Sequence, residues 1–111
     1  MKTSYFAYPG IADDPLAVSI ARFPPRWWGS RRRCITLAPS LKLFRLAKNG
    51  LPFDDYRAEY LKALSHLDPL QIWQDLQDCT LLCFEKDPSQ CHRRIVAEWL
   101  EKSVSVTIPE L

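Results

Sequence analysis

The segment CTLLCFE (79–85) constrains the fold more than any other part of the chain, because a helix must begin within a few residues of it. Its short, apolar composition is typical of a buried strand. In the next segment Asp87 is placed to cap a helix, with Pro88 as its first residue and Gln90 as its third. We expect this helix to continue through IVAEWLEK (95–102). This strand–loop–helix unit indicates a fold that mixes strands and helices.

Further strands are predicted near both ends of the chain. TSYFAY (3–8) and LAVSIA (16–21) are short and rich in aromatic and β-branched residues, which is typical of strands. Neither alternates cleanly between polar and apolar residues, so both suit a parallel sheet that is buried on two faces. FPPRWWGSRRR (23–33) is predicted to be a loop, and SVSVTIPEL (103–111) a last strand.

Three more helices are predicted, each preceded by residues that can cap or open it. They are LKLFRLAKN (41–49) after Ser40, YRAEYLKALSHL (56–67) after Asp54 or Asp55, and LQIWQDLQD (70–78) after Asp68 and Pro69. Strands interleaved with helices predict a single α/β domain over residues 1–111, with a short, mostly parallel sheet covered by helices.

The bulk composition is that of an ordinary globular domain, with 47% apolar and 25% charged residues. No apolar run approaches the roughly 20 residues that span a bilayer. The amino terminus also lacks the pattern of a secretory signal. These features predict a cytoplasmic protein with four reduced thiols, at Cys34, Cys79, Cys83 and Cys91.

Charge is distributed unevenly, although the net charge is only +2. Between Leu16 and Phe53 there is no acidic residue, and the basic ones are Arg22, Arg26, Arg31, Arg32, Arg33, Lys42, Arg45 and Lys48. Such a segment is a candidate surface for phosphate or another anion, or else a solvated basic face.

The predicted last helix begins with a further group of cations. His92, Arg93 and Arg94 lie near the amino end of the helix, where the helix dipole is already positive. Cations are unfavourable there unless a negative group lies beside them. The partner of these cations is the carboxylate of Glu85, an external anion, or solvent alone. Arg22 ends the second predicted strand, and the carboxyl ends of parallel strands meet at one edge of a sheet. We therefore expect Arg22 and the basic helix start to face a shared ligand site.

Four side chains near this edge could carry chemistry. Glu85 and His92 are candidates for acid–base catalysis, and Cys83 or Cys91 for a nucleophile. No cysteine is followed six positions later by arginine, and there is no Cys-x-x-Cys pair, which excludes phosphatase-type and thioredoxin-like sites. Cys83, Cys91 and His92 are one ligand short of a structural zinc site, so no metal site and no cofactor are predicted.

The predicted loop after the second strand allows two interpretations. Trp27 and Trp28 could stack on bases while Arg26 and Arg31, Arg32 and Arg33 hold phosphates. Alternatively, both tryptophans fold under the loop as a lid, and the arginines are solvated.

At LLCFEKDPSQCHRRIVAEWL (81–100) the chain resembles the carboxy-terminal signature of the domain of unknown function 488 (DUF488) family, in which a strand ending in Cys-x-Glu precedes Cys-His-Arg and an amphipathic helix. SIARFPPRWW (19–28), TSYFA (3–7) and YRAEYLKAL (56–64) extend the resemblance over nearly the whole chain. The resemblance implies a small, three-layer, Rossmann-like α/β domain. It also implies a set of polar residues at one end of the sheet, namely Arg22, Cys83, Glu85, Cys91, His92 and Arg93.

Two departures from that family are visible. Many relatives read Asp-Val-Arg where this chain has Ile20-Ala21-Arg22, so a mechanism with that aspartate as base does not apply here. The Gly-His-Ser-like end of the first strand is replaced by Tyr5-Phe6-Ala7.

The main hypothesis is that the domain binds a phosphorylated or otherwise anionic ligand, such as a nucleotide or a nucleic-acid end, at the carboxyl edge of its sheet. Arg22 and Arg93 would hold the anion, and Arg26, Trp27 and Trp28 would line or cover the site. One alternative is a non-catalytic DNA- or RNA-binding module that uses loop 26–33. The other is a structural or protein-interaction domain.

Overall fold

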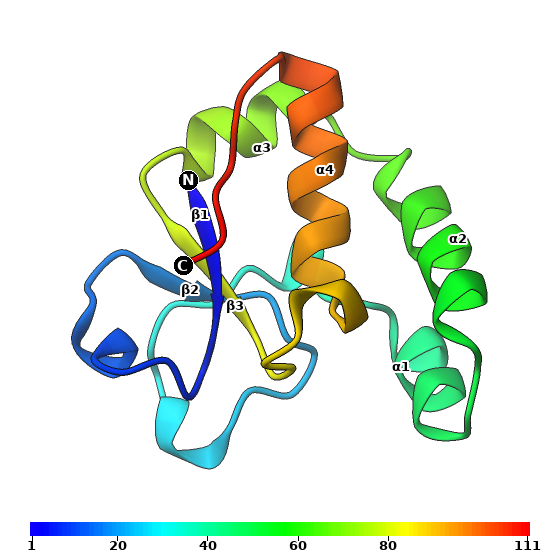
Figure 1. The fold of residues 1–111 in the computed structure, drawn as a ribbon, viewed down its shortest axis with the longest axis horizontal. Coiled ribbons are helices and arrows are strands. Elements are labelled where there is room, and N and C mark those ends of the chain that lie inside the picture. The colour runs from blue at the N-terminus through cyan, green and yellow to red at the C-terminus, as the bar shows by residue number, and fades with distance from the viewer.

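A three-stranded parallel sheet lies at the centre of the computed structural model, which describes residues 1–111 (Figure 1). Strand β3 (Thr80–Cys83) lies between β1 (Lys2–Tyr5) and β2 (Ala17–Ser19). Cys83 is paired with Tyr5 at the carboxyl end of the sheet. All four residues of β3 are buried, as the apolar run predicts. The three strands are confirmed, and each is shorter than the segment predicted for it.

Four α-helices accompany the sheet, with bounds α1 (Leu41–Lys48), α2 (Phe53–Leu64), α3 (Pro69–Leu76) and α4 (His92–Val104). Helix α4 packs against β1 and β3, and α2 and α3 pack against α4 (Figure 1). Two predicted caps are confirmed: Ser40 accepts a hydrogen bond from the Leu43 amide, and Asp68 accepts from Leu70 and Gln71. No helix has the length and apolar character needed to cross a membrane.

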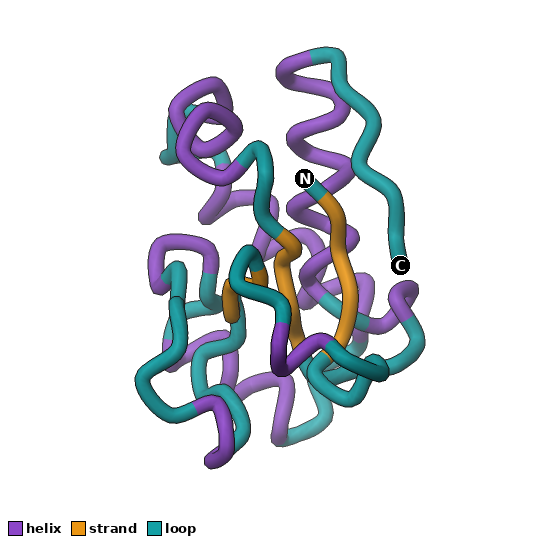
Figure 2. Tube along the Cα trace, turned by 90° about the vertical axis from the view of Figure 1, so that its left-hand side faces the viewer, coloured by secondary structure: helices purple, strands orange, loops and turns teal.

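The two faces of the sheet are covered differently. Leu81 belongs to the larger core, which contains the inward faces of α2 and α4, whereas the next residue, Leu82, points to the opposite face. There it packs with Ile11 and Trp28, which belong to 3-10 turns. Figure 2, which looks from this side, shows loops and short turns around the carboxyl ends of the strands. The α/β fold is confirmed, but long helices cover one face of the sheet only.

The start of α4 differs from the prediction. Asp87 caps a short 3-10 turn, Pro88–Gln90, through the Ser89 amide. The backbone then returns to an extended conformation at Cys91, and α4 begins at His92. His92 and the two arginines therefore lie in the first turn of α4 rather than the second. In α2, Asp54 and Asp55 also lie inside the first turn and neither caps it, because the helix begins at Phe53.

The predicted last strand, 103–111, is wrong. Helix α4 continues to Val104 and ends at Ser105, which has a left-handed φ of 56°. The segment that follows runs beside β1 (Figures 1 and 2) and forms one parallel bridge, between Thr3 and Glu110. Toward the start of β1 the ladder cannot extend, because Pro109, whose backbone faces β1 in this register, has no N–H group. The Ile108 amide faces away from β1 and donates to the Glu101 carboxylate.

A fully buried arginine fastens this C-terminal segment to the sheet. Arg93 has no exposed surface, and its guanidinium donates to the Glu110 carboxylate at 2.9 Å from Nη2 and 3.0 Å from Nε. The same carboxylate accepts from the Thr3 hydroxyl at 2.6 Å. A buried cation with a bidentate partner and further hydrogen bonds is stable, but removing the partner leaves an uncompensated charge.

We predict that Glu110→Gln lowers the free energy of unfolding by about 2 kcal/mol, because the buried Arg93 loses its counter-charge. The control is Glu98→Gln, which breaks the exposed Arg57–Glu98 pair and should cost less than about 1 kcal/mol. Urea unfolding of both variants measures the difference. Equal losses would show that Glu110 does not anchor the C-terminal segment.

Candidate functional site at the carboxyl edge of the sheet

A cavity of about 730 Å³ lies at the carboxyl edge of the sheet. Its wall combines the segments that follow β2 and β3, the first residue of α4, and side chains of α1 and α2. The lining residues are Ala21, Arg22, Phe23, Pro39, Phe44, Ala47, Lys48, Leu51, Phe53, Tyr56, Cys83, Phe84, Glu85, Gln90, Cys91 and His92. The parallel sheet explains its position, because adjacent strand ends meet here.

Five residues singled out from the sequence line this cavity: Arg22, Cys83, Glu85, Cys91 and His92. They come from three separate segments, after β2, around the end of β3 and at the start of α4. Because β2 and β3 are neighbouring parallel strands, their carboxyl ends place these side chains around one hollow.

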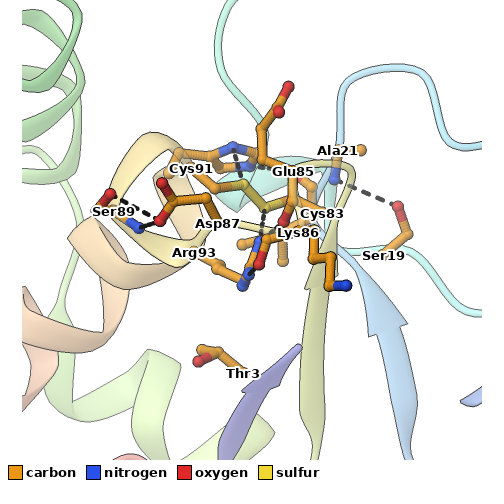
Figure 3. The surroundings of a disulfide bond; sticks show 12 residues. Thr3, Ser19, Ala21, Cys83, Glu85, Lys86, Asp87, Ser89, Cys91 and Arg93 are labelled. Carbon is orange, nitrogen blue, oxygen red and sulfur yellow. Dashed lines mark hydrogen bonds between the residues drawn. A yellow bond between two sulfur atoms is a disulfide. The ribbon is translucent and has the colours of Figure 1, made fainter. Parts of the chain in front are cut away.

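Arg93 does not line the cavity. Besides Glu110, it donates to the backbone carbonyl oxygens of Glu85 and Lys86, the latter at 3.2 Å. The Glu85 carboxylate points away from it (Figure 3), so the pairing considered from the sequence is replaced by one with Glu110. Arg93 contacts two residues of the cavity wall, Glu85 through its backbone carbonyl and Cys83 through its Sγ, which lies 3.2 Å from Nη1.

Two cations of the wall have no carboxylate partner. Neither Arg22 nor Lys48 belongs to any of the salt bridges in the structure. Arg22 lies 6.0 Å from the ring centre of Phe23, and Lys48 lies 5.4 Å from that of Phe44. These cation–π contacts leave the charges available to a ligand.

Lys48 and the aromatic wall were not identified from the sequence as site residues. Lys48 is the last basic residue of the acid-free segment, and that was the only available signal. Phe44 and Phe53 belong to α1 and α2, and nothing in their local patterns shows that these helices approach the sheet edge.

His92 is held as a neutral, oriented imidazole. Its Nε2 lies 2.8 Å from the Ile20 carbonyl oxygen, which can only accept, so Nε2 carries the proton. The ring also packs edge-on against Tyr60, with 5.4 Å between ring centres. Burial lowers the pKa of His92 to about 4; the hydrogen bond to Ile20 opposes this shift and the nearby Arg93 charge adds to it. Its other nitrogen, Nδ1, therefore offers a lone pair at neutral pH.

The structure joins Cys83 and Cys91 by a disulfide, although four thiols were expected from the sequence (Figure 3). Both residues are buried, at the end of β3 and immediately before α4. Cys34 and Cys79 are free. The paired cysteines form part of the cavity wall beside His92.

The tryptophan- and arginine-rich loop lies elsewhere. Trp28 is 1% exposed and packs against Phe6 on the loop-covered face of the sheet, with 5.3 Å between ring centres. Trp27 contacts the same Phe6 ring. Arg31 donates to the carbonyl oxygens of both tryptophans, and Arg32 donates to the Cys79 sulfur. Arg26 and Arg33 are exposed. None of these residues lines the cavity.

We predict that His92 makes the folded protein less stable in acid. Its pKa is about 4 when folded and near the ordinary value of 6.5 when unfolded, so the unfolded chain binds more protons between these values. Stability is complete above pH 6.5 and falls by about 3 kcal/mol as pH drops to 4.

The matched variant is His92→Gln, whose amide can still donate to the Ile20 carbonyl but does not titrate. Urea unfolding between pH 4 and 7.5, in buffer with EDTA, should show a smaller pH slope for this variant. Identical slopes would mean that His92 is not buried in its neutral form.

Comparison with known proteins identifies the family to which this chain belongs. A family model described as the active DUF488-N3 subclade matches residues 5–104, from the end of β1 to the end of α4. Searches of curated proteins and of solved structures found no match. The matched range includes all the residues that line the cavity and confirms the resemblance seen in the Cys-x-Glu and Cys-His-Arg segments. The chain therefore belongs to the DUF488 family.

Proposed function

We propose that this protein binds a nucleotide-sized anionic ligand in the cavity at the carboxyl edge of its sheet. The observation that carries the proposal is the presence of two unpaired cations, Arg22 and Lys48, in one cavity of about 730 Å³. Ligand sites for small molecules usually measure about 300–1,000 Å³ and combine apolar walls with a few polar groups. The cavity has both characteristics.

The aromatic wall favours a ligand that carries a flat ring. Phe44, Phe53 and Tyr56 line the cavity together with the two cations. Phe53 and Tyr56 are stacked on each other, 5.8 Å apart between ring centres, and Tyr56 stacks in turn on Tyr60, so Phe44 and Phe53 are the rings on which a base could stack. A base could stack on such rings while Arg22 and Lys48 hold the phosphate. An inorganic anion would gain the contacts with Arg22 and Lys48 but no stacking on the aromatic rings.

The polar side chains of the wall are suited to proton transfer on that ligand. Glu85 is the only acidic residue that lines the cavity, and its carboxylate forms no salt bridge. It could accept a proton from a ligand hydroxyl or from water. His92 offers Nδ1 as a second acceptor. The description of the matched subclade as active is in keeping with such chemistry.

We include a Rossmann-like fold in this proposal. The parallel sheet, the order in which β3 separates β1 and β2, and a ligand site outside the carboxyl ends of the strands support it. The loop-covered face of the sheet is a departure from the usual three-layer arrangement.

The proposal favours a small anion over a nucleic-acid surface on loop 26–33. Arg31 and Arg32 are engaged in hydrogen bonds within the chain, and Trp28 is buried. Stacking on bases would require Trp28 to leave its core position. Arg26, Arg33 and Trp27 remain exposed, so the loop keeps part of its basic surface but not the paired tryptophans that the nucleic-acid alternative requires.

We predict that nucleoside monophosphates raise the melting temperature of the protein more than phosphate or sulfate does. Arg22→Ala and Lys48→Ala should each weaken nucleotide affinity about tenfold or more, because each removes a charge-assisted hydrogen bond. Thermal-shift and calorimetric titrations of oxidised protein in EDTA measure this.

The matched control is Arg45→Ala, which removes an exposed arginine of α1 outside the cavity and should keep wild-type affinity. The proposal fails if no ligand shifts the melting temperature at millimolar concentration. It also fails if Arg45→Ala loses as much affinity as Arg22→Ala. Salt-sensitive oligonucleotide binding that is lost on neutralising Arg31, Arg32 and Arg33 would instead favour the nucleic-acid alternative.

A further inference from the structure

We propose that Cys83, Cys91 and His92, when the cysteines are reduced, form a three-ligand site for a zinc-like divalent ion that faces the cavity. The inference uses the same cavity as the proposed function and shares His92 with the proposed proton transfer, but it does not depend on Arg22 and Lys48, which carry the proposed anion binding. The sequence alone, with three ligands instead of four, predicted no metal site. A site with three protein ligands is possible when its fourth position faces a cavity that can admit water or substrate.

The three donor atoms are close enough to bind one ion. The Sγ atoms of both cysteines and a ring nitrogen of His92 lie within 4.8 Å of one another, and all three residues are buried. The Cys91 Sγ lies 3.9 Å from Nδ1 of His92. In a tetrahedral zinc site, with Zn–S near 2.3 Å and Zn–N near 2.0 Å, neighbouring donors are about 3.5–3.8 Å apart. Small side-chain rotations reach that spacing.

The cysteine backbones also suit coordination. The Cα atoms of Cys83 and Cys91 are 7.0 Å apart, just beyond the usual disulfide range of about 4.4–6.8 Å. Two thiolates on one ion have sulfurs about 3.8 Å apart, which requires a wider approach than a disulfide does. The end of β3 and the start of α4 provide such a spacing without rearrangement of either element.

His92 has the orientation that metal-binding histidines have. Its Nε2–H donates to the Ile20 carbonyl oxygen at 2.8 Å, which leaves the lone pair on Nδ1. Nδ1 is the nitrogen that lies beside the Cys91 sulfur. In metal sites the non-ligating nitrogen of histidine almost always makes such a bond to a carbonyl or a carboxylate, which fixes the ring.

Arg93 contacts a second proposed ligand, the sulfur of Cys83, from outside the metal site. Its Nη1 lies 3.2 Å from the Cys83 sulfur, and the guanidinium is fixed by Glu110. A donor cation at this distance favours the thiolate, which is the ligand form of cysteine. Two thiolates and an imidazole are the donors that zinc and other borderline divalent ions prefer, whereas magnesium and calcium prefer oxygen.

The fourth coordination position would face the cavity. All three ligands line it, together with Glu85 and Gln90. Catalytic zinc sites commonly use three protein ligands and keep one position for water or substrate, and two cysteines with one histidine is a known set. A ligand held by Arg22 and Lys48 would therefore lie within the same hollow as this open position.

Metal binding and the disulfide exclude each other. A dithiol reductant transfers two electrons and two protons to the Cys83–Cys91 disulfide, giving two thiols, and is itself oxidised to a disulfide. Binding of the ion then releases the two thiol protons to solvent. The oxidised protein should accordingly bind no ion at this site.

The test is a Co²⁺ titration of protein that has been reduced with dithiothreitol and then desalted under nitrogen. We expect one ion per chain, with the thiolate charge-transfer absorption and the intense visible bands of tetrahedral Co²⁺, and displacement by Zn²⁺. Cys83→Ser and Cys91→Ser should weaken the affinity roughly a hundredfold, and His92→Gln at least tenfold. Cys34→Ser should behave as wild type, because Cys34 is a free thiol outside the cavity.

The wild type in its two redox states provides a test that does not depend on the folding of a variant. The unreduced protein should show no thiolate absorption with Co²⁺. Absence of that absorption in reduced wild type, or its loss in folded Cys34→Ser, overturns the proposal. Because the nucleotide titrations use oxidised protein in EDTA, failure of the metal site and failure of anion binding give separate results.

Discussion

The buried guanidinium of Arg93 connects the segments that meet at the carboxyl edge of the sheet. It connects α4 with the carbonyl groups after β3, with the Cys83 sulfur and, through Glu110, with the C-terminal segment beside β1. A cation in the first turn of a helix is unfavourable on its own. Glu110 and the carbonyl oxygens offset that cost, and in doing so they fix the first residues of α4. The positions of Cys91 and His92 on the cavity wall follow from this anchor.

The division of the sheet into two differently covered faces explains where the cavity lies. Helices α2 and α4 cover one face, and α1 and α2 extend past the strand ends. Their aromatic side chains therefore form one wall of the cavity, and the segments after β2 and β3 form the other. The opposite face is closed by Trp28 and its neighbours. A smaller pocket of about 410 Å³ is lined by Arg32 and Arg33, but its wall holds Asp75 and no aromatic side chain.

Much of this arrangement could be predicted from local sequence. The strand in CTLLCFE, the caps Ser40 and Asp68, and the convergence of Arg22 with Cys83, Glu85 and His92 all follow from short-range rules and from the geometry of parallel strands. These rules work because each depends on a few adjacent residues or on a fixed property of sheets.

The remaining features depend on contacts between distant residues. Glu110 is separated from Arg93 by the rest of α4 and an irregular segment, so their pairing has no local signature. The prediction of a last strand failed because α4 continues to Val104 and because Pro109 has no N–H group to donate to β1. Similarly, the proximity of Cys83 to Cys91 depends on the 3-10 turn and the extended residue that precede α4.

The most direct test of the central claim is a crystal structure of the protein grown with 5-bromouridine monophosphate, with anomalous data at the bromine edge. The account predicts a bromine peak beside the aromatic wall, and phosphate density within hydrogen-bonding distance of Arg22 and Lys48. A bromine peak on loop 26–33, or a cavity filled by packed side chains with Arg22 turned outward, would contradict it.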